Sequence, residues 1–87
     1  LDFEGPRGLA VDGSTLFVCD GAAGLKIFDI ISTSQIEERA RFPDREVFDV
    51  ILVPPVAVVV GPDGIDQYDY TDPEDITHLS HLDVVGE

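Results

Sequence analysis

The chain has 87 residues, of which 44% are hydrophobic, and its 18 acidic and 5 basic side chains give a formal net charge of -13. This apolar content is too high for a disordered tail, and the excess of acid would repel nucleic acid and acidic membrane surfaces. No apolar run approaches the ~18 residues of a membrane span, and a single cysteine, Cys19, excludes an internal disulfide and any multi-cysteine zinc site.

The first half of the chain is predicted to form four short strands joined by turns. Residues 9–11 ("LAV") are brief and apolar, and Gly13 with Ser14 supplies the turn that follows. Residues 16–19 ("LFVC") are apolar at every position, which is the pattern of a strand covered from two sides. After the glycine-rich turn "DGAAG", residues 25–30 ("LKIFDI") alternate in part, and "IEERARF" fits a half-buried outer strand.

The second half repeats this order. "GLKIFDI" from Gly24 matches "GIDQYDY" from Gly64 at an offset of forty residues, and the same offset places "LFVCDG" over "VAVVVG". Further upstream the offset becomes 41, because "GLAV" lies over "DVIL", so we expect a one-residue deletion in the first turn, where "VPP" replaces "DGST". The chain is therefore predicted to be two copies of one unit of about forty residues, the first spanning 1–46 and the second 47–87.

The last segment of each copy is the one for which a helix competes with a strand. "SQIE" from Ser34 resembles a capping box, and "DPED" from Asp72 has the N-cap, proline and early acids of a helix start. A helix of about seven polar-rich residues would be marginal in isolation. We therefore expect strands at "IEERARF" and "ITHLSHL", with the helix as the alternative.

A four-stranded unit of about forty residues, with a second strand that is apolar on both faces, is typical of a β-propeller blade. Blades stack face to face, so we expect residues 16–19 and 56–60 to be buried between sheets and Val58→Asp to prevent folding. The predicted fold is all-β, with two tandem four-stranded antiparallel β-propeller blades that are part of a larger or oligomeric propeller. The remaining blades would come from a longer form of the same chain or from a homo-oligomer.

The residues of both copies also resemble a known family. "LFVCDG", "GLKIFDI" and, in the second copy, "TDPEDI" are similar to the LVIVD repeat, a propeller-forming unit found mainly in bacterial and archaeal surface or secreted proteins. The first copy departs from that pattern with "STSQ" in place of the Asp-Pro turn, and the second with Asp66 and Gln67 where the family prefers apolar or neutral residues. The resemblance implies an extracellular or cell-surface structural and interaction module.

Acidic residues gather in "DGIDQYDYTDPED" and invite comparison with a calcium site; they are Asp63, Asp66, Asp69, Asp72, Glu74 and Asp75. Calcium loops place acids at every second position before a glycine, whereas the spacing here is three, which alternates faces in an extended chain. We therefore predict solvated acids and no metal site. Asp29 and Asp69 end equivalent strands and are predicted to accept backbone N–H bonds from the next turn.

His78 and His81 are the only imidazoles of the chain and lie three residues apart. On a strand we expect them to point to opposite faces, which argues against a shared metal ion, whereas the helical alternative would bring them to one face. Cys19 is predicted to be a small buried hydrophobe rather than a nucleophile, because no base is paired with it. No residue is therefore assigned to a catalytic, cofactor-binding or metal site, and the chain is predicted not to be an enzyme.

The favoured function is a non-catalytic scaffold or protein-interaction module, with further blades and another protein as partners. The alternative is part of the propeller of an enzyme or cation-binding protein whose site lies on other blades. Loops near the central channel would hold Arg7, Arg45 and Asp49, a thin set for catalysis. The scarcity of lysine beside so many acids also resembles proteins from high-salt environments, with an ordinary acidic surface as the alternative.

Overall fold

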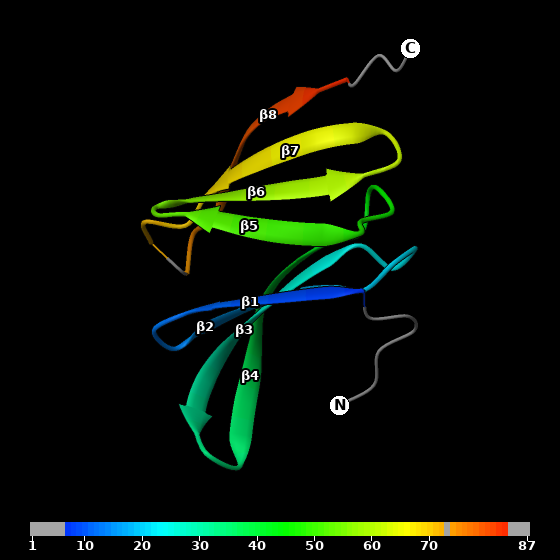
Figure 1. Cartoon of the computed structure of the whole chain (residues 1–87). Helices are drawn as coiled ribbons and strands as arrows, with labels where there is room; N and C mark the ends of the chain where they lie inside the picture. The colour runs from blue at the N-terminus through cyan, green and yellow to red at the C-terminus, as the bar shows by residue number, and fades with distance from the viewer. Residues whose placement is uncertain (1–6, 73, 84–87) are drawn as a thin grey trace.

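The computed structural model describes residues 7–72 and 74–83, which form two four-stranded antiparallel sheets and no helix (Figure 1). Each sheet is a simple meander, so that strands adjacent in the sequence are adjacent in the sheet. The all-β prediction is confirmed, and the outer segments are strands rather than helices. The first sheet contains β1 (Gly8–Asp12), β2 (Thr15–Cys19), β3 (Leu25–Ser32) and β4 (Gln35–Phe42), and the second β5 (Asp49–Val53), β6 (Val56–Gly61), β7 (Gly64–Asp69) and β8 (Thr77–Leu82).

The forty-residue repeat is visible in the backbone of the last two strands of each sheet. The ladder between β3 and β4 shifts register between Ile27 and Phe28, and the ladder between β7 and β8 shifts at the equivalent place, between Gln67 and Tyr68. A glycine with positive φ stands immediately before β3 (Gly24, +91°) and at the first position of β7 (Gly64, +129°), a conformation that disfavours other residues. The equivalence of β3 with β7 therefore holds at an offset of forty residues.

The first two strands of the sheets are equivalent at an offset of 41, which corrects the alignment predicted for "LFVC". Cys19 lies opposite Leu25, whereas Val60 lies opposite Ile65, so the counterpart of Cys19 is Val60. The β1–β2 and β5–β6 turns are equally long, and the one-residue deletion falls in the second hairpin instead. The sequence could not reveal this because every position of "VAVVV" is apolar, so a slip by one residue preserves the match.

One face of the first sheet packs against one face of the second and forms a shared core. The buried members of this core are Phe17, Cys19, Leu25, Ile27, Val47, Val50, Ala57, Val59, Tyr68 and Tyr70. Tyr70 follows β7 and crosses to the first sheet, where its ring meets Phe17 edge-on at 4.9 Å and its hydroxyl donates to Asp12 Oδ2 at 2.8 Å. The strands β1 and β5 approach so closely that a side chain at Gly8 would collide with Asp49.

The two outward faces of this pair of sheets expose apolar side chains. On β6, Ala57 and Val59 face the first sheet and are buried, while Val58 faces the other way and is half-buried. The same outward face carries Ile51 and Val53, which are 55% and 59% exposed. The prediction that residues 56–60 are all buried between sheets is therefore wrong at alternate positions, because no described residue covers the far face of the second sheet.

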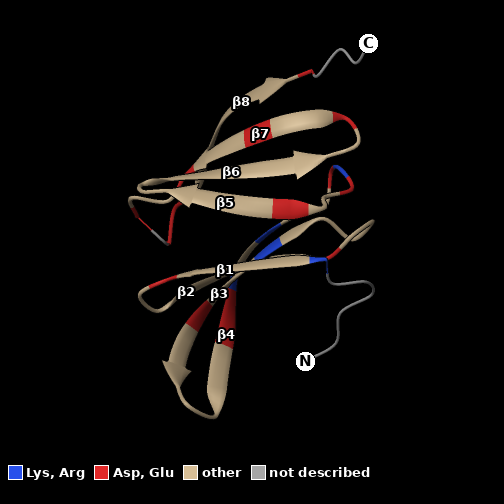
Figure 2. Cartoon of the chain, in the orientation of Figure 1, with Lys and Arg blue, Asp and Glu red and all other residues tan. Residues whose placement is uncertain are grey.

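The outward face of the first sheet also exposes apolar side chains, on its edge strand β1. Leu9 and Val11 of β1 are 65% and 55% exposed, although Val18 and Phe28 on the same face are buried. Acidic residues are spread over the strands and turns of both sheets, with a few basic residues scattered among them (Figure 2). The described residues include no long apolar helix of the kind that crosses a membrane.

Candidate functional site

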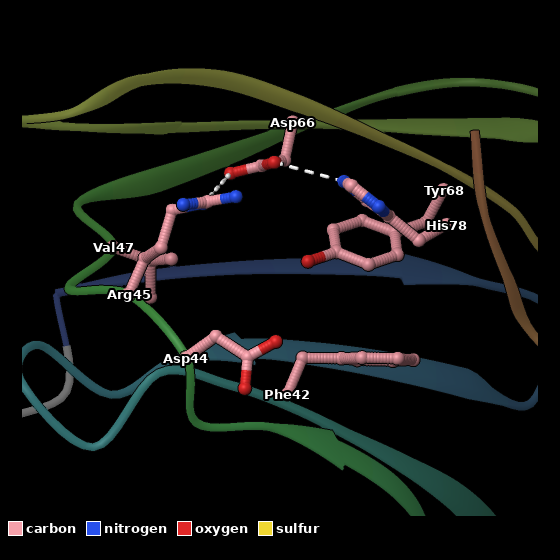
Figure 3. Close-up of a pocket in the computed structure, with 7 residues that line it drawn as sticks. All are labelled: Phe42, Asp44, Arg45, Val47, Asp66, Tyr68 and His78. Carbon is pink, nitrogen blue, oxygen red and sulfur yellow. Dashed lines mark hydrogen bonds and ion pairs between the residues drawn. The ribbon is translucent and has the colours of Figure 1, made fainter. Parts of the chain in front are cut away.

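The buried carboxylate of Asp66 is the centre of a polar cluster between the two sheets. Its Oδ1 lies 2.9 Å from His78 Nε2, and its Oδ2 lies 3.3 Å from Arg45 Nε (Figure 3). The same Oδ1 also lies 2.9 Å from His81 Nδ1. The Asp66 side chain is only 8% exposed. Because a buried carboxylate is costly unless it is paired, three donors from β8 and from the segment between the sheets satisfy a charge that the core would otherwise reject.

The register shift in the outer ladder brings the two histidines together. His81 lies opposite Asp66 and His78 lies opposite Tyr68, which leaves Leu79 as the extra residue of a β-bulge. Because of the extra residue, His78 and His81 lie on the same face of the sheet although they are three residues apart. The prediction that His78 and His81 point to opposite faces is therefore wrong, since it assumed a regular strand. The sequence carries one sign of this bulge: the apolar residues at 76, 79 and 82 are three apart and so break the strict alternation of a regular strand.

The protonation states of the cluster follow from its geometry. Burial alone would raise the pKa of the Asp66 carboxyl, but hydrogen bonds from His78 and His81 and the charges of His81 and Arg45 bring it below its ordinary value of 3.8. The hydrogen bond to Asp66 raises the pKa of His81 above its ordinary value of 6.5, and a second bond to Asp83 acts in the same direction. The cluster thus favours an ionised Asp66 next to a protonated His81.

A pocket of about 210 Å³ adjoins the cluster between the two sheets (Figure 3). The rings of Phe42 and Tyr68 form one side, with their centroids 4.6 Å apart. Burial raises the pKa of Tyr68 to about 12, and the carboxylates of Asp66 and Asp44 act in the same direction, so the phenol is neutral at physiological pH. The full lining is Phe42, Asp44, Arg45, Val47, Asp66, Tyr68 and His78.

The first sheet places different charges at the positions equivalent to this cluster. At an offset of forty residues, Lys26 replaces Asp66, Glu38 replaces His78 and Arg41 replaces His81. Lys26 Nζ binds Asp20 Oδ2 at 2.8 Å, and the Arg41 guanidinium makes two hydrogen bonds to the Glu38 carboxylate. The equivalent position of the ladder therefore holds a cation in one sheet and an anion in the other. The sequence contains this difference in charge at positions forty residues apart, although the repeat itself is recognised from the residues that the two copies share.

The acids of the second copy serve separate local roles instead of converging. Asp69 Oδ1 accepts hydrogen bonds from the backbone N and the Oγ1 of Thr71, which confirms the turn role predicted for it. Asp29 pairs with the Arg39 side chain at 3.0 Å instead. Asp72 Oδ1 accepts a bond from the backbone of Glu74. Within residues 7–72 and 74–83, no group of three or more His, Cys, Asp or Glu side chains is placed to hold a metal ion.

The remaining candidate residues lie apart from the Asp66 cluster, with one exception. Cys19 is buried in the shared core, as predicted, and burial together with nearby Asp49 raises the pKa of its thiol to about 12. The Arg7 guanidinium lies 5.9 Å from the ring centroid of Phe48, and Asp49 Oδ1 accepts a bond from the neighbouring Val50 N–H. Of the three residues predicted to line a channel, only Arg45 joins the cluster.

Comparisons with known proteins give no information on function, so a functional assignment depends on the geometry described above. No family model, no curated protein and no solved structure matches the chain.

Proposed function

We propose that the chain is a non-catalytic scaffold in which each four-stranded sheet is a β-propeller blade, acting by association with further blades and with another protein. The observation that carries this proposal is the direction in which the sheets stack. The far face of the first sheet consists of counterparts of the residues that the second sheet presents to the core: Leu9, Val18 and Lys26 correspond to Val50, Val59 and Asp66. The two sheets therefore pack head to tail.

Head-to-tail packing leaves two open faces that are complementary in kind. A heterologous contact of this type repeats until a ring closes, and closed propellers have about 4 to 8 blades. Exposed apolar faces on both sides, marked by Leu9 and Val11 and by Ile51 and Val53, fit such a continuation. The partners would be further blades, from a longer form of this chain or from other copies of it.

The chemistry of the described side chains supports a role without catalysis. The one thiol is buried and protonated. The histidines and Arg45 are all engaged by Asp66, and His81 is bound by Asp83 as well. The acidic surface would favour basic or cation-carrying partners and disfavour polyanions. The resemblance to the LVIVD repeat supports a place outside the cell or at its surface.

The test is a complementation of two single-face variants followed by sedimentation. Leu9→Arg places a charge on the far face of the first sheet, and Ile51→Arg places one on the far face of the second. In head-to-tail association neither variant can bind itself, but the intact face of each fits the intact face of the other. We expect the wild-type chain to associate, each variant to sediment as a monomer, and the mixture to form a one-to-one dimer.

Thr33→Arg is the matched control, because it adds the same charge in an exposed turn and should leave association unchanged. A wild-type chain that stays a well-folded monomer with a sharp unfolding transition at high concentration would refute the proposal. Self-association of Ile51→Arg alone would show instead that copies meet through identical faces, against the head-to-tail arrangement.

A further inference from the structure

His81 makes contacts through both of its ring nitrogens that a neutral imidazole cannot make. Nδ1 lies 2.9 Å from Asp66 Oδ1, and Nε2 lies 2.9 Å from Asp83 Oδ1. An ionised carboxylate only accepts hydrogen bonds, and a neutral imidazole carries one N–H. Only the imidazolium form can therefore donate to both carboxylates at once. His78 differs, since its described hydrogen bond involves Nε2 alone.

The carboxylate that His81 binds belongs to the contact between the two sheets. Asp66 lies on the face of β7 that points to the first sheet, next to the buried Val59 in the ladder. Its other oxygen faces Arg45, which comes from the segment that connects β4 to β5. One carboxylate thus joins β7, β8 and the connecting segment, and the charge of His81 acts on all three.

We propose that His81 is a proton-operated clamp, which in its protonated form ties β8 to Asp66 and thereby stabilises the contact between the two sheets. When His81 loses its proton, one ring nitrogen presents a lone pair to a carboxylate, so the ring can no longer donate to Asp66 and Asp83 together and its positive charge no longer acts on Asp66. This inference concerns regulation of the sheet contact and holds whether or not the chain is a scaffold, because it concerns packing within one chain.

The charged groups around the clamp set its direction. Asp66 from β7 and Asp83 after β8 favour the imidazolium, Arg45 from the connecting segment opposes it, and Asp44 adds a carboxylate to the adjoining pocket. The side of the first sheet nearest the cluster contributes the apolar Phe42. Two carboxylates in direct contact with the ring outweigh one guanidinium, so the clamp closes on acidification.

The sign of the effect on stability follows from linkage. A histidine whose pKa is raised in the folded state contributes stability that is complete below its unfolded value of 6.5 and is lost as the pH rises through the folded value. Asp66, whose pKa is lowered, contributes stability that is present above 3.8 and is lost as the pH falls further. The contact between the sheets should therefore be strongest between these limits and weaken above neutral pH.

The experiment combines a titration of the histidines with unfolding at two pH values, in buffer containing EDTA so that no metal ion can mimic the effect. Ring C–H resonances should show His81 titrating at a higher pH in the folded chain than in urea, and at a lower pH in Asp66→Asn. The unfolding constant of the wild type should rise severalfold between pH 6 and pH 8. His81→Gln, which offers an amide donor but no proton to lose, should abolish most of that rise.

His78→Gln is the matched control, because it changes a neighbour on the same carboxylate and should keep most of the pH dependence. If Asp66→Asn does not fold, Asp83→Asn provides the test, since it removes the second carboxylate from an exposed position and should lower the His81 titration by a smaller amount. An unchanged His81 titration between folded and unfolded chains, or an unchanged pH dependence in His81→Gln, would overturn the proposal.

Discussion

Neighbouring valines of β6 should respond very differently to replacement by aspartate. Val59 is 1% exposed and faces the first sheet, whereas Val58 points to the open face and is half-buried. Val59→Asp loses the burial of a valine, ~1.5–3 kcal/mol, and adds an unpaired buried charge that costs several kcal/mol more. The total loss is on the order of 5 kcal/mol or above. Since the stability of a folded protein is only roughly 0.05–0.15 kcal/mol per residue, this loss is a large part of the stability of an 87-residue chain, and we expect this variant to be unfolded.

The sequence predicted that Val58→Asp would prevent folding, but the outward facing of Val58 changes that expectation. The variant keeps its carboxylate in water and should cost about 1 kcal/mol or less in a dilute chain, although it should abolish association through the open face. Urea titrations followed by far-ultraviolet circular dichroism, at several protein concentrations, separate the two effects. The wild-type midpoint should rise with concentration, and the Val58→Asp midpoint should not. A folded Val59→Asp, or a Val58→Asp that is equally damaging at high dilution, would show that the facing of β6 is wrong.

Three further outcomes are expected. Gly64→Ala should lower the free energy of unfolding by on the order of 2 kcal/mol or more, because φ is +129° and the new Cβ would meet the Leu82 carbonyl. A urea titration measures this loss. Gly13→Ala is the control and should cost less, because Gly13 has φ +61° and lies in open space. Cys19 should react with a thiol reagent only at the rate of unfolding, so rapid labelling of the native chain would contradict its burial. Melting temperature should rise from low to molar salt as acidic repulsion is screened, whereas a flat response would remove the high-salt interpretation.

The sequence predicted the fold where its pattern constrains the backbone. Turn residues and short apolar runs were enough for eight strands, and the residues matched from Gly24 and from Gly64 onward were enough for the equivalence of β3 with β7 at forty residues. The alignment of β2 with β6 failed because residues 56–60 are apolar throughout, and register is encoded in alternation. The pairing of each strand with its neighbour decides which of these side chains face the core.

The cluster at Asp66 could not be predicted for a related reason. Its geometry depends on a bulge that shifts His78 and His81 onto one face, and a bulge is a property of two paired strands rather than of one. From the sequence, Asp66 is one of several acids predicted to be solvated and a departure from the apolar or neutral residue of the LVIVD pattern. Asp66 is buried by, and receives its three donors from, segments that are separated along the chain. No local spacing of residues in the sequence therefore predicts its environment.

The exchange of Lys26 for Asp66 at equivalent positions has an evolutionary consequence. Tandem repeats are prone to recombination that copies one unit over the other, and a second unit overwritten by the first would carry Lys26, Glu38 and Arg41 in the place of Asp66, His78 and His81. Arg45 would then face an ammonium group in place of the Asp66 carboxylate with which it now pairs. The two units are thus no longer interchangeable, and selection against such copying would keep their polar residues divergent while the apolar residues stay alike.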